Sequence, residues 1–235
     1  MDYDDRHRTF LQAVIQSGVI LDQDAVVLCV KIFDEKIDIS AIAARINDKL
    51  ERLAMSMKAG ICELTGNKYW SVVSTTHEET VKIPTELTQS QKMFLRSIYS
   101  EIIGGDGCIS STSCLNLCNS LETKFSMIEA DRFLKHLIKQ KWLYCKDGNI
   151  YMGVRSIIEL MPYFRATYQD NFHNCFLCRE VVFHGHKCDN CDEMCHYYCL
   201  IEYAKNRNIR KCPQCKHNLD ISCITGNRYY YILHQ

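Results

Sequence analysis

The chain has 235 residues, of which 28 are basic and 28 are acidic, so its formal net charge is zero. This balance excludes the strongly basic footprint that is typical of autonomous nucleic-acid-binding proteins. No apolar run is long enough to span a bilayer, and the charged N-terminus lacks the apolar core of a secretory signal. We therefore expect no membrane association, a reducing compartment, and two or three modest domains.

Residues 1–83 predict three helices followed by a β-hairpin. Apolar residues recur at helical spacing in the first two helices, which we place around Phe10–Ile15 and over Ala25–Phe33. Asp38 can cap the third helix, which we expect to end at Gly60. The apolar face of this third helix consists of Ile39, Ile42, Ala43, Ile46, Leu50 and Leu53. Short strands at 61–63 and 69–73 should then flank the turn-rich segment 65–68.

Residues 84–160 repeat the same order. The sequences Thr88-x-x-Gln91 and Ser126-x-x-Glu129 are capping boxes, and they predict the starts of the first and third helices. A short helix over 112–120 should lie between them. The dipeptide Asp147-Gly148 is a strong signal for a second hairpin.

Three helices followed by a hairpin is the order of a winged helix, a variant of the helix-turn-helix. The predicted third helices interleave basic with acidic residues, so a solvated face is favoured over a DNA surface, and we expect DNA contact to be weak. Tandem winged helices also serve as platforms for protein docking. A linking helix, Ile157–Tyr168, should lead into the C-terminal part of the chain.

Eight potential metal ligands follow as four ordered pairs. The two-residue gap within each pair lets a turn direct both side chains at one ion, and four pairs are enough for two closed tetrahedral sites. Thiolate-rich tetrahedral sets favour zinc over other metals. The pairs are Cys175 and Cys178, Cys188 and Cys191, His196 and Cys199, and Cys212 and Cys215.

The order of these pairs suits a cross-brace. The first and third pairs would then hold one zinc ion, and the second and fourth pairs the other. Sequential pairing, as in two zinc-ribbon knuckles, remains an alternative that spacing does not exclude. A disulfide framework fits poorly because the chain has 15 cysteines, an odd number, and no secretory signal. An iron–sulfur cluster would not usually recruit the histidine. We interpret Cys195, which precedes His196, as a non-ligand.

The predicted fold is therefore mostly helical with small β-hairpins. It comprises tandem winged-helix domains (1–83 and 84–160), a linker helix (161–172) and a two-zinc cross-brace RING-like domain (173–235).

We consider four kinds of zinc module for this ligand order: a purely structural domain, a plant-homeodomain finger, a nucleic-acid finger and a RING. Nucleic-acid fingers with two cysteines and two histidines use a different ligand set and one ion each. Plant-homeodomain fingers usually carry an aromatic residue where this chain has Arg210. Features of a RING are present around the ligands. They are Leu177, Leu200, Pro213 within the last pair, and Lys216 after the last ligand, and they predict the contact with a ubiquitin-conjugating enzyme.

Two winged-helix-like modules followed by these four pairs closely resemble the non-SMC element one family. This is the RING-variant subunit of the SMC complex that acts in DNA repair and recombination. The resemblance covers nearly the whole chain, including Phe10-Leu11 and Lys141-Trp142-Leu143. It implies a nuclear protein bound to a MAGE-type partner and a kleisin-type subunit, with ubiquitin ligase activity that is often weak without the MAGE partner. The chain departs from the pattern in lacking a long basic tail after the RING.

A RING does not use a catalytic nucleophile, so we expect no catalytic residue and no thioester with ubiquitin. Such a module holds the ubiquitin-loaded conjugating enzyme in a reactive pose, and the rate gain comes from orientation. Cys195 or Cys223 as a catalytic cysteine is disfavoured, because a single unpaired cysteine without a base positioned to activate it is weak evidence for a nucleophile. A non-catalytic scaffold, folded by zinc and docking partners through the winged helices, is the alternative of a different class.

Overall fold

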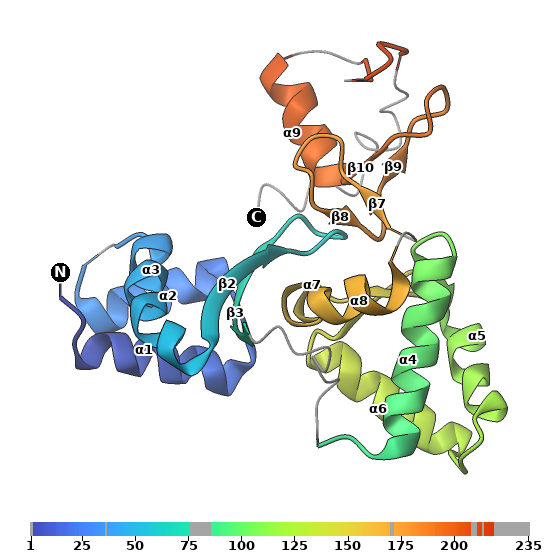
Figure 1. The fold of residues 1–235 in the computed structure, drawn as a ribbon, viewed down its shortest axis with the longest axis horizontal. Coiled ribbons are helices and arrows are strands. Elements are labelled where there is room, and N and C mark those ends of the chain that lie inside the picture. Colours follow the sequence, from blue (N-terminus) through green and yellow to red (C-terminus); the bar gives the residue numbers. More distant parts are fainter. Residues whose placement is uncertain are drawn as a thin grey trace.

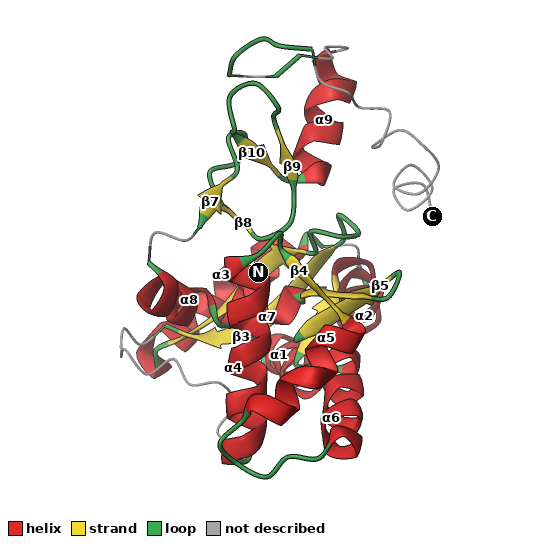
Figure 2. Ribbon diagram, turned by 90° about the vertical axis from the view of Figure 1, so that its right-hand side faces the viewer, coloured by secondary structure: helices red, strands yellow, loops and turns green. Residues whose placement is uncertain are grey.

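The structure is a computed structural model that describes residues 2–35, 37–75, 86–169, 172–207, 211–212 and 214–218. Two helical modules lie beside each other, and a smaller cysteine-rich module sits above both (Figure 1). The view turned by 90° shows that small module at one end of the molecule (Figure 2). Within the described ranges, no helix has the length and apolar character needed to cross a membrane. The predicted fold class is confirmed.

The first module contains three helices and a three-stranded antiparallel sheet in the order β1-β3-β2. Its core lies between the helices and the sheet and includes Phe10, Ile42, Ile46 and Trp70. Its elements are α1 (Asp5–Ser17), β1 (Val19–Leu21), α2 (Asp22–Phe33), α3 (Ile39–Leu50), the 3-10 turn η1 (Glu51–Leu53), β2 (Met55–Ile61) and β3 (Lys68–Ser74).

The end of α3 differs from the sequence prediction. The helix stops at Leu50 and a 3-10 turn follows, after which Ala54 takes a left-handed conformation (φ 50°) and β2 begins. Leu53 therefore leaves the apolar face and is 68% exposed. Gly60 does not end the helix but lies inside β2, where a side chain would overlap Ile158 of the second module. The prediction was wrong because a glycine needed for close packing resembles a glycine that ends a helix.

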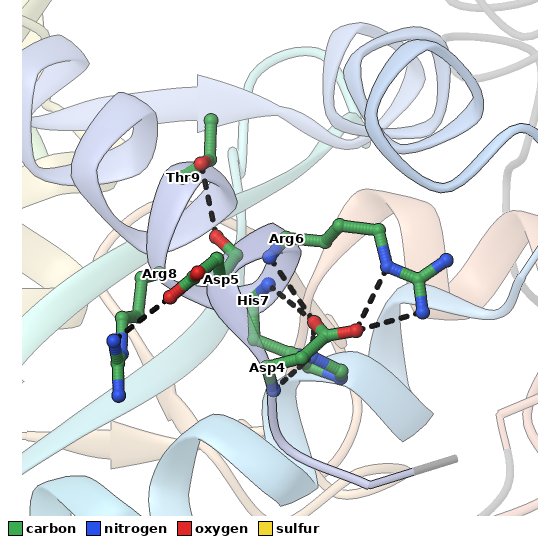
Figure 3. A network of polar contacts seen from close by, with 6 residues as sticks. All are labelled: Asp4, Asp5, Arg6, His7, Arg8 and Thr9. Carbon is green, nitrogen blue, oxygen red and sulfur yellow. Dashed lines mark hydrogen bonds and ion pairs between the residues drawn. The ribbon is translucent and has the colours of Figure 1, made fainter.

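Helix α1 begins with a dense polar network around Asp4 (Figure 3). The Asp4 carboxylate accepts hydrogen bonds from the backbone amides of Arg6 and His7 at 3.1 and 3.4 Å and from Arg6 Nε at 2.8 Å. These contacts, above all the one from the Arg6 side chain, hold the pKa of Asp4 well below its ordinary value. The network satisfies amides that a helix start leaves without partners.

The second module repeats the arrangement, with its sheet in the order β4-β6-β5. Both predicted capping boxes are confirmed: Thr88 caps α4 and Ser126 caps α6. The predicted hairpin at Asp147-Gly148 is also confirmed, and both residues have positive φ angles, as a tight two-residue turn requires. The elements are α4 (Gln89–Gly104), β4 (Cys108–Ser110), α5 (Ser111–Asn116), the 3-10 turn η2 (Leu117–Ser120), α6 (Met127–Lys139), β5 (Leu143–Lys146) and β6 (Asn149–Met152).

Two features of the modules were not predicted. Each sheet has a third strand of three residues, β1 or β4, which is too short to show a hydrophobic period. The expected linking helix is two helices, α7 (Val154–Glu159) and α8 (Met161–Tyr168), with Pro162 in the first turn of α8. Val154 and Ile158 of α7 pack with Cys62, Leu64 and Val73 of the first module. This shared core fixes the two helical modules against each other.

In its described residues, the cysteine-rich module contains two short ribbons and one helix. Its strands pair as β7 with β8 and β9 with β10, and each ribbon is two residue pairs long. Its elements are β7 (His173–Asn174), β8 (Val181–Val182), β9 (His186–Lys187), β10 (Met194–Cys195) and α9 (Tyr197–Arg207).

Candidate metal centre

The eight predicted ligands gather into two clusters. The ligand atoms of Cys175, Cys178, His196 and Cys199 lie within 4.8 Å of one another. The same limit holds for the second cluster, which consists of Cys188, Cys191, Cys212 and Cys215. The first ligand pair thus meets the third and the second meets the fourth, which is the cross-brace pairing and not the sequential one.

Three of the ligand pairs sit on the same kind of turn, which we call a knuckle. In each knuckle the amide of the first cysteine donates to the carbonyl five residues later, at 2.7, 2.9 and 2.8 Å. The residue directly after the second cysteine takes a left-handed conformation: Arg179 (φ 67°), Asp192 (59°) and Lys216 (63°). The fourth pair, His196 and Cys199, lies at the start of α9, where the amide of Leu200 donates to the carbonyl of His196 at 3.0 Å. The recurring two-residue gap thus reflects a local turn that directs both thiols to one side.

The spacing of the ligand atoms fits zinc. The sulfur atoms of Cys188 and Cys215, and those of Cys191 and Cys212, are 3.7 Å apart. A regular tetrahedron with zinc–sulfur bonds of about 2.3 Å has an edge of about 3.8 Å. In the first cluster, His196 Nδ1 lies 3.4 Å from Cys178 Sγ and 3.8 Å from Cys199 Sγ. The geometry and the thiolate-rich donor set are together compatible with two zinc ions.

In each cluster the pKa of one thiol is lowered toward the thiolate, the form that binds metal, while the pKa values of others, such as Cys199 and Cys212, are raised. Hydrogen bonds from the thiols of Cys195 and Cys199 lower the pKa of Cys175. The backbone amide of His217 is the main contact that lowers the pKa of Cys215, to about 6. Cys195 is buried and approaches Cys175, but it is not one of the four residues that form the first cluster.

The first cluster has a contact that sequence reasoning missed. Nε2 of His196, the ring nitrogen that faces away from the thiols, donates to the carbonyl of Val181 at 3.0 Å and lies 3.3 Å from a carboxylate oxygen of Glu63. Glu63 belongs to the turn between β2 and β3 of the first module, more than a hundred residues away in the chain. Glu63 is not part of any of the four ligand pairs, so the sequence gives no signal for this contact and only the tertiary structure reveals it.

The four residues predicted to contact a conjugating enzyme have different surroundings. Leu177 is half-buried in the first knuckle and Lys216 is exposed beside the last one. Leu200 is 1% exposed and packs among the cysteines of both clusters, so its side chain is a core residue and not part of an open groove. Pro213 lies outside the described residues, as does Cys223.

Comparison with known proteins agrees with this architecture. Residues 7–160 match the family model for the Nse1 non-SMC component of the SMC5-6 complex, and residues 175–215 match a RING-like domain. The chain is 29% identical to the human and 30% identical to the bovine “Non-structural maintenance of chromosomes element 1 homolog”, in alignments that cover 90% of this chain and 82% of each relative. A chain of a solved “Nse1-Nse3-Nse4 complex” superposes with a TM-score of 0.80 at 26% identity, over 94% of this chain and 99% of that one. The chain therefore belongs to the family of Nse1 non-SMC components of the SMC5-6 complex and carries a RING-like domain with two Cys/His clusters for zinc.

Proposed function

We propose that the chain is a RING-type ubiquitin ligase subunit of the SMC5-6 complex and acts in DNA repair and recombination in the nucleus. The observation that carries this proposal is the cross-brace of two metal clusters, which holds the knuckles of the RING-like domain in fixed positions. A RING of this kind recruits a ubiquitin-conjugating enzyme and orients its thioester. Because the gain comes from orientation, the proposal assigns no nucleophilic residue to this chain.

The residues that we propose to contact the conjugating enzyme are Leu177 and Lys216, together with Pro213, which lies outside the described residues. Leu177 lies between the two ligands of the first knuckle, and its half-buried position leaves part of the side chain accessible. Lys216 is exposed directly after the last ligand, where a cation can face bound ubiquitin. Leu200 belongs to the buried core against which Leu177 packs.

We further propose that a MAGE-type and a kleisin-type subunit are the partners of this chain. The name of the similar solved structure, a complex of Nse1 with Nse3 and Nse4, supports this assignment. The winged-helix modules are the proposed docking surface for the MAGE-type subunit. Among the described residues, the large apolar side chains that are exposed all lie in these modules: Ile15, Val27, Val30, Leu53, Met127 and Ile128.

The ligase proposal is tested with a reconstituted complex of this chain and a MAGE-type partner. Release of ubiquitin from a loaded conjugating enzyme to free lysine should fall several-fold in Lys216→Ala and in Leu177→Ser, while zinc content stays unchanged. Lys211→Ala is the matched control, because Lys211 is an exposed lysine of the same domain next to the ligand Cys212.

Two results would contradict this proposal. One is loss of activity only in variants that also lose zinc. The other is absence of discharge by the wild-type complex with every conjugating enzyme tried. Either result favours the non-catalytic scaffold, a reading that the core position of Leu200 already supports.

The docking proposal is tested by charge substitutions on the exposed apolar residues. Val27→Asp or Ile128→Asp should weaken binding of the MAGE-type partner at least tenfold, because each would place a charge in an apolar contact. Lys211→Glu in the zinc domain should leave binding unchanged. If the isolated zinc domain binds the partner as tightly as the full chain, the docking surface lies there instead.

A further inference from the structure

The loop between the first two ligand pairs, residues 179–187, lies in the zinc domain and packs against the second helical module. The Phe183 ring packs at edge-on angles against Phe164 and Phe172, with ring centroids 5.6 and 5.8 Å apart. The His184 ring meets Tyr151 of β6 at 4.9 Å. Gly107 of the second module lies so close to the backbone of Phe183 that a side chain on Gly107 would overlap it. This loop is thus seated in the second winged-helix core.

The same loop is held from the other side by the first module. The hairpin β2–β3 reaches from that module toward the zinc domain (Figure 1) and carries Glu63 at its tip. One carboxylate oxygen of Glu63 accepts the backbone amide of Phe183, and the other accepts that of His184, both at 2.9 Å. Glu63 is only 3% exposed, so these two amides satisfy a carboxylate that would otherwise be costly to bury.

The third contact of Glu63 reaches the metal cluster. His196 is 2% exposed, and its Nδ1 faces the thiols of Cys178 and Cys199. Its Nε2 lies between the carbonyl of Val181 and the Glu63 oxygen, at 3.0 and 3.3 Å. Metal-bound histidines commonly donate their second ring N–H to a carboxylate, which fixes the tautomer and the ring orientation and raises the basicity of the ligand. Here that carboxylate comes from a different module of the chain.

We propose that Glu63 is a positioning residue for the first zinc site, so that metal affinity at this site and docking of the zinc domain on the first winged helix are coupled. Undocking would remove the carboxylate from His196, and loss of the metal would release the His196 ring from Glu63. Because such coupling is reciprocal, metal binding at the first site and docking of the zinc domain strengthen each other by the same factor. The second cluster does not include any contact with Glu63, so it stays outside the coupling. This coupling does not depend on ubiquitin transfer by the chain.

The first test is the substitution Glu63→Gln in the full chain. It replaces one carboxylate oxygen by an NH2 group of similar size and removes the negative charge. The affinity of the first site for metal should fall about 10–100-fold, the usual effect of removing an outer-shell partner. Co²⁺ serves as the probe, because a site with one nitrogen and three sulfur ligands absorbs differently from a site with four sulfur ligands. Competition with a chelator then gives the affinity of each site, and the second site is an internal control. Glu180→Gln, an exposed carboxylate of the same loop, is the matched variant and should change neither site.

A second measurement reports docking without reference to metal affinity. Hydrogen exchange at the amides of Phe183 and His184 should accelerate in Glu63→Gln, because both lose a charged acceptor. The same two amides should exchange faster in the wild-type chain when metal is removed from the first site. Unchanged exchange in both cases would overturn the coupling.

A double-mutant cycle separates positioning from general structural support. His196→Cys keeps four ligands but removes the ring N–H, so adding Glu63→Gln to it should change metal affinity far less than it does in the wild-type chain. An equal loss in both backgrounds, or an equal loss at both metal sites, would show that Glu63 supports the fold only. If Glu63→Gln does not fold, Glu63→Asp replaces it in the same cycle, since it keeps the charge and shortens the reach to His196.

Discussion

The hairpins of the two winged-helix modules have the same place in the element order but opposite surroundings. The tip of the first hairpin is covered by the zinc domain, and its Glu63 is buried against Phe183, His184 and His196. The tip of the second hairpin, Asp147-Gly148, is exposed, and a side chain added at Gly148 would meet no other atom within 4 Å. The tip of the first hairpin is thus buried between modules, and the tip of the second hairpin is exposed.

Length and tip chemistry explain this difference. Strand β2 has seven residues and β5 has four, so the first hairpin extends further by about 10 Å, at about 3.3 Å per residue. The first tip is also a longer turn, from Cys62 to Asn67, in which Gly66 donates to the carbonyl of Cys62 at 2.8 Å. A repeated fold therefore does not imply a repeated function for the corresponding parts.

Loss of a zinc ligand should have the largest effect, and the tips of the two hairpins should respond to it differently. In Cys175→Ser we expect zinc content to fall from two ions per chain to one or fewer, since metal binding contributes ~10–16 kcal/mol in small finger-type domains. Amides at the tip of the first hairpin should then exchange faster, while those at the exposed tip of the second hairpin, residues 147–148, stay unchanged. Elemental analysis and site-resolved hydrogen exchange measure both outcomes. An equal response at the two hairpin tips would show that both hairpins depend on the first metal site.

Glycine substitutions at the two tips should have a smaller and unequal effect. Gly66 (φ 71°) and Gly148 (φ 80°) both have left-handed backbones, so alanine at either position should destabilise its hairpin by ~1–2 kcal/mol. Only Gly66→Ala should also reduce metal affinity at the first site, because it disturbs the turn that holds Glu63. Denaturant unfolding together with Co²⁺ titration checks this. Reduced metal affinity at the first site in Gly148→Ala would show that the second hairpin is also coupled to that site.

The smallest effect is expected for Cys195→Ser. This thiol is buried beside Cys175, and the contact with Cys175, together with burial, raises its pKa, so it stays protonated while its neighbours bind metal. Zinc content should remain two ions per chain, and exchange at both hairpin tips should match the wild type. A loss of one zinc ion would mean that Cys195 takes part in the first site after all.

Features that depend on neighbouring residues were predictable from the sequence alone. The capping boxes of α4 and α6 and the Asp147-Gly148 hairpin require only residues within a few positions of one another. The same is true of each knuckle, because its turn is closed by local hydrogen bonds. The four Cys/His pairs therefore indicated which residues bind metal. The spacing of apolar residues in the helices, with the turn signals of the hairpins, indicated the winged-helix order.

Other features were decided only when distant segments met. Gly60 marks a close approach to Ile158, Leu200 is buried because two clusters close around it, and Glu63 finds partners at positions 183, 184 and 196. In each case the residue type is compatible with several local structures. The environment that selects one of them comes from another module, and a one-dimensional pattern does not contain that contact.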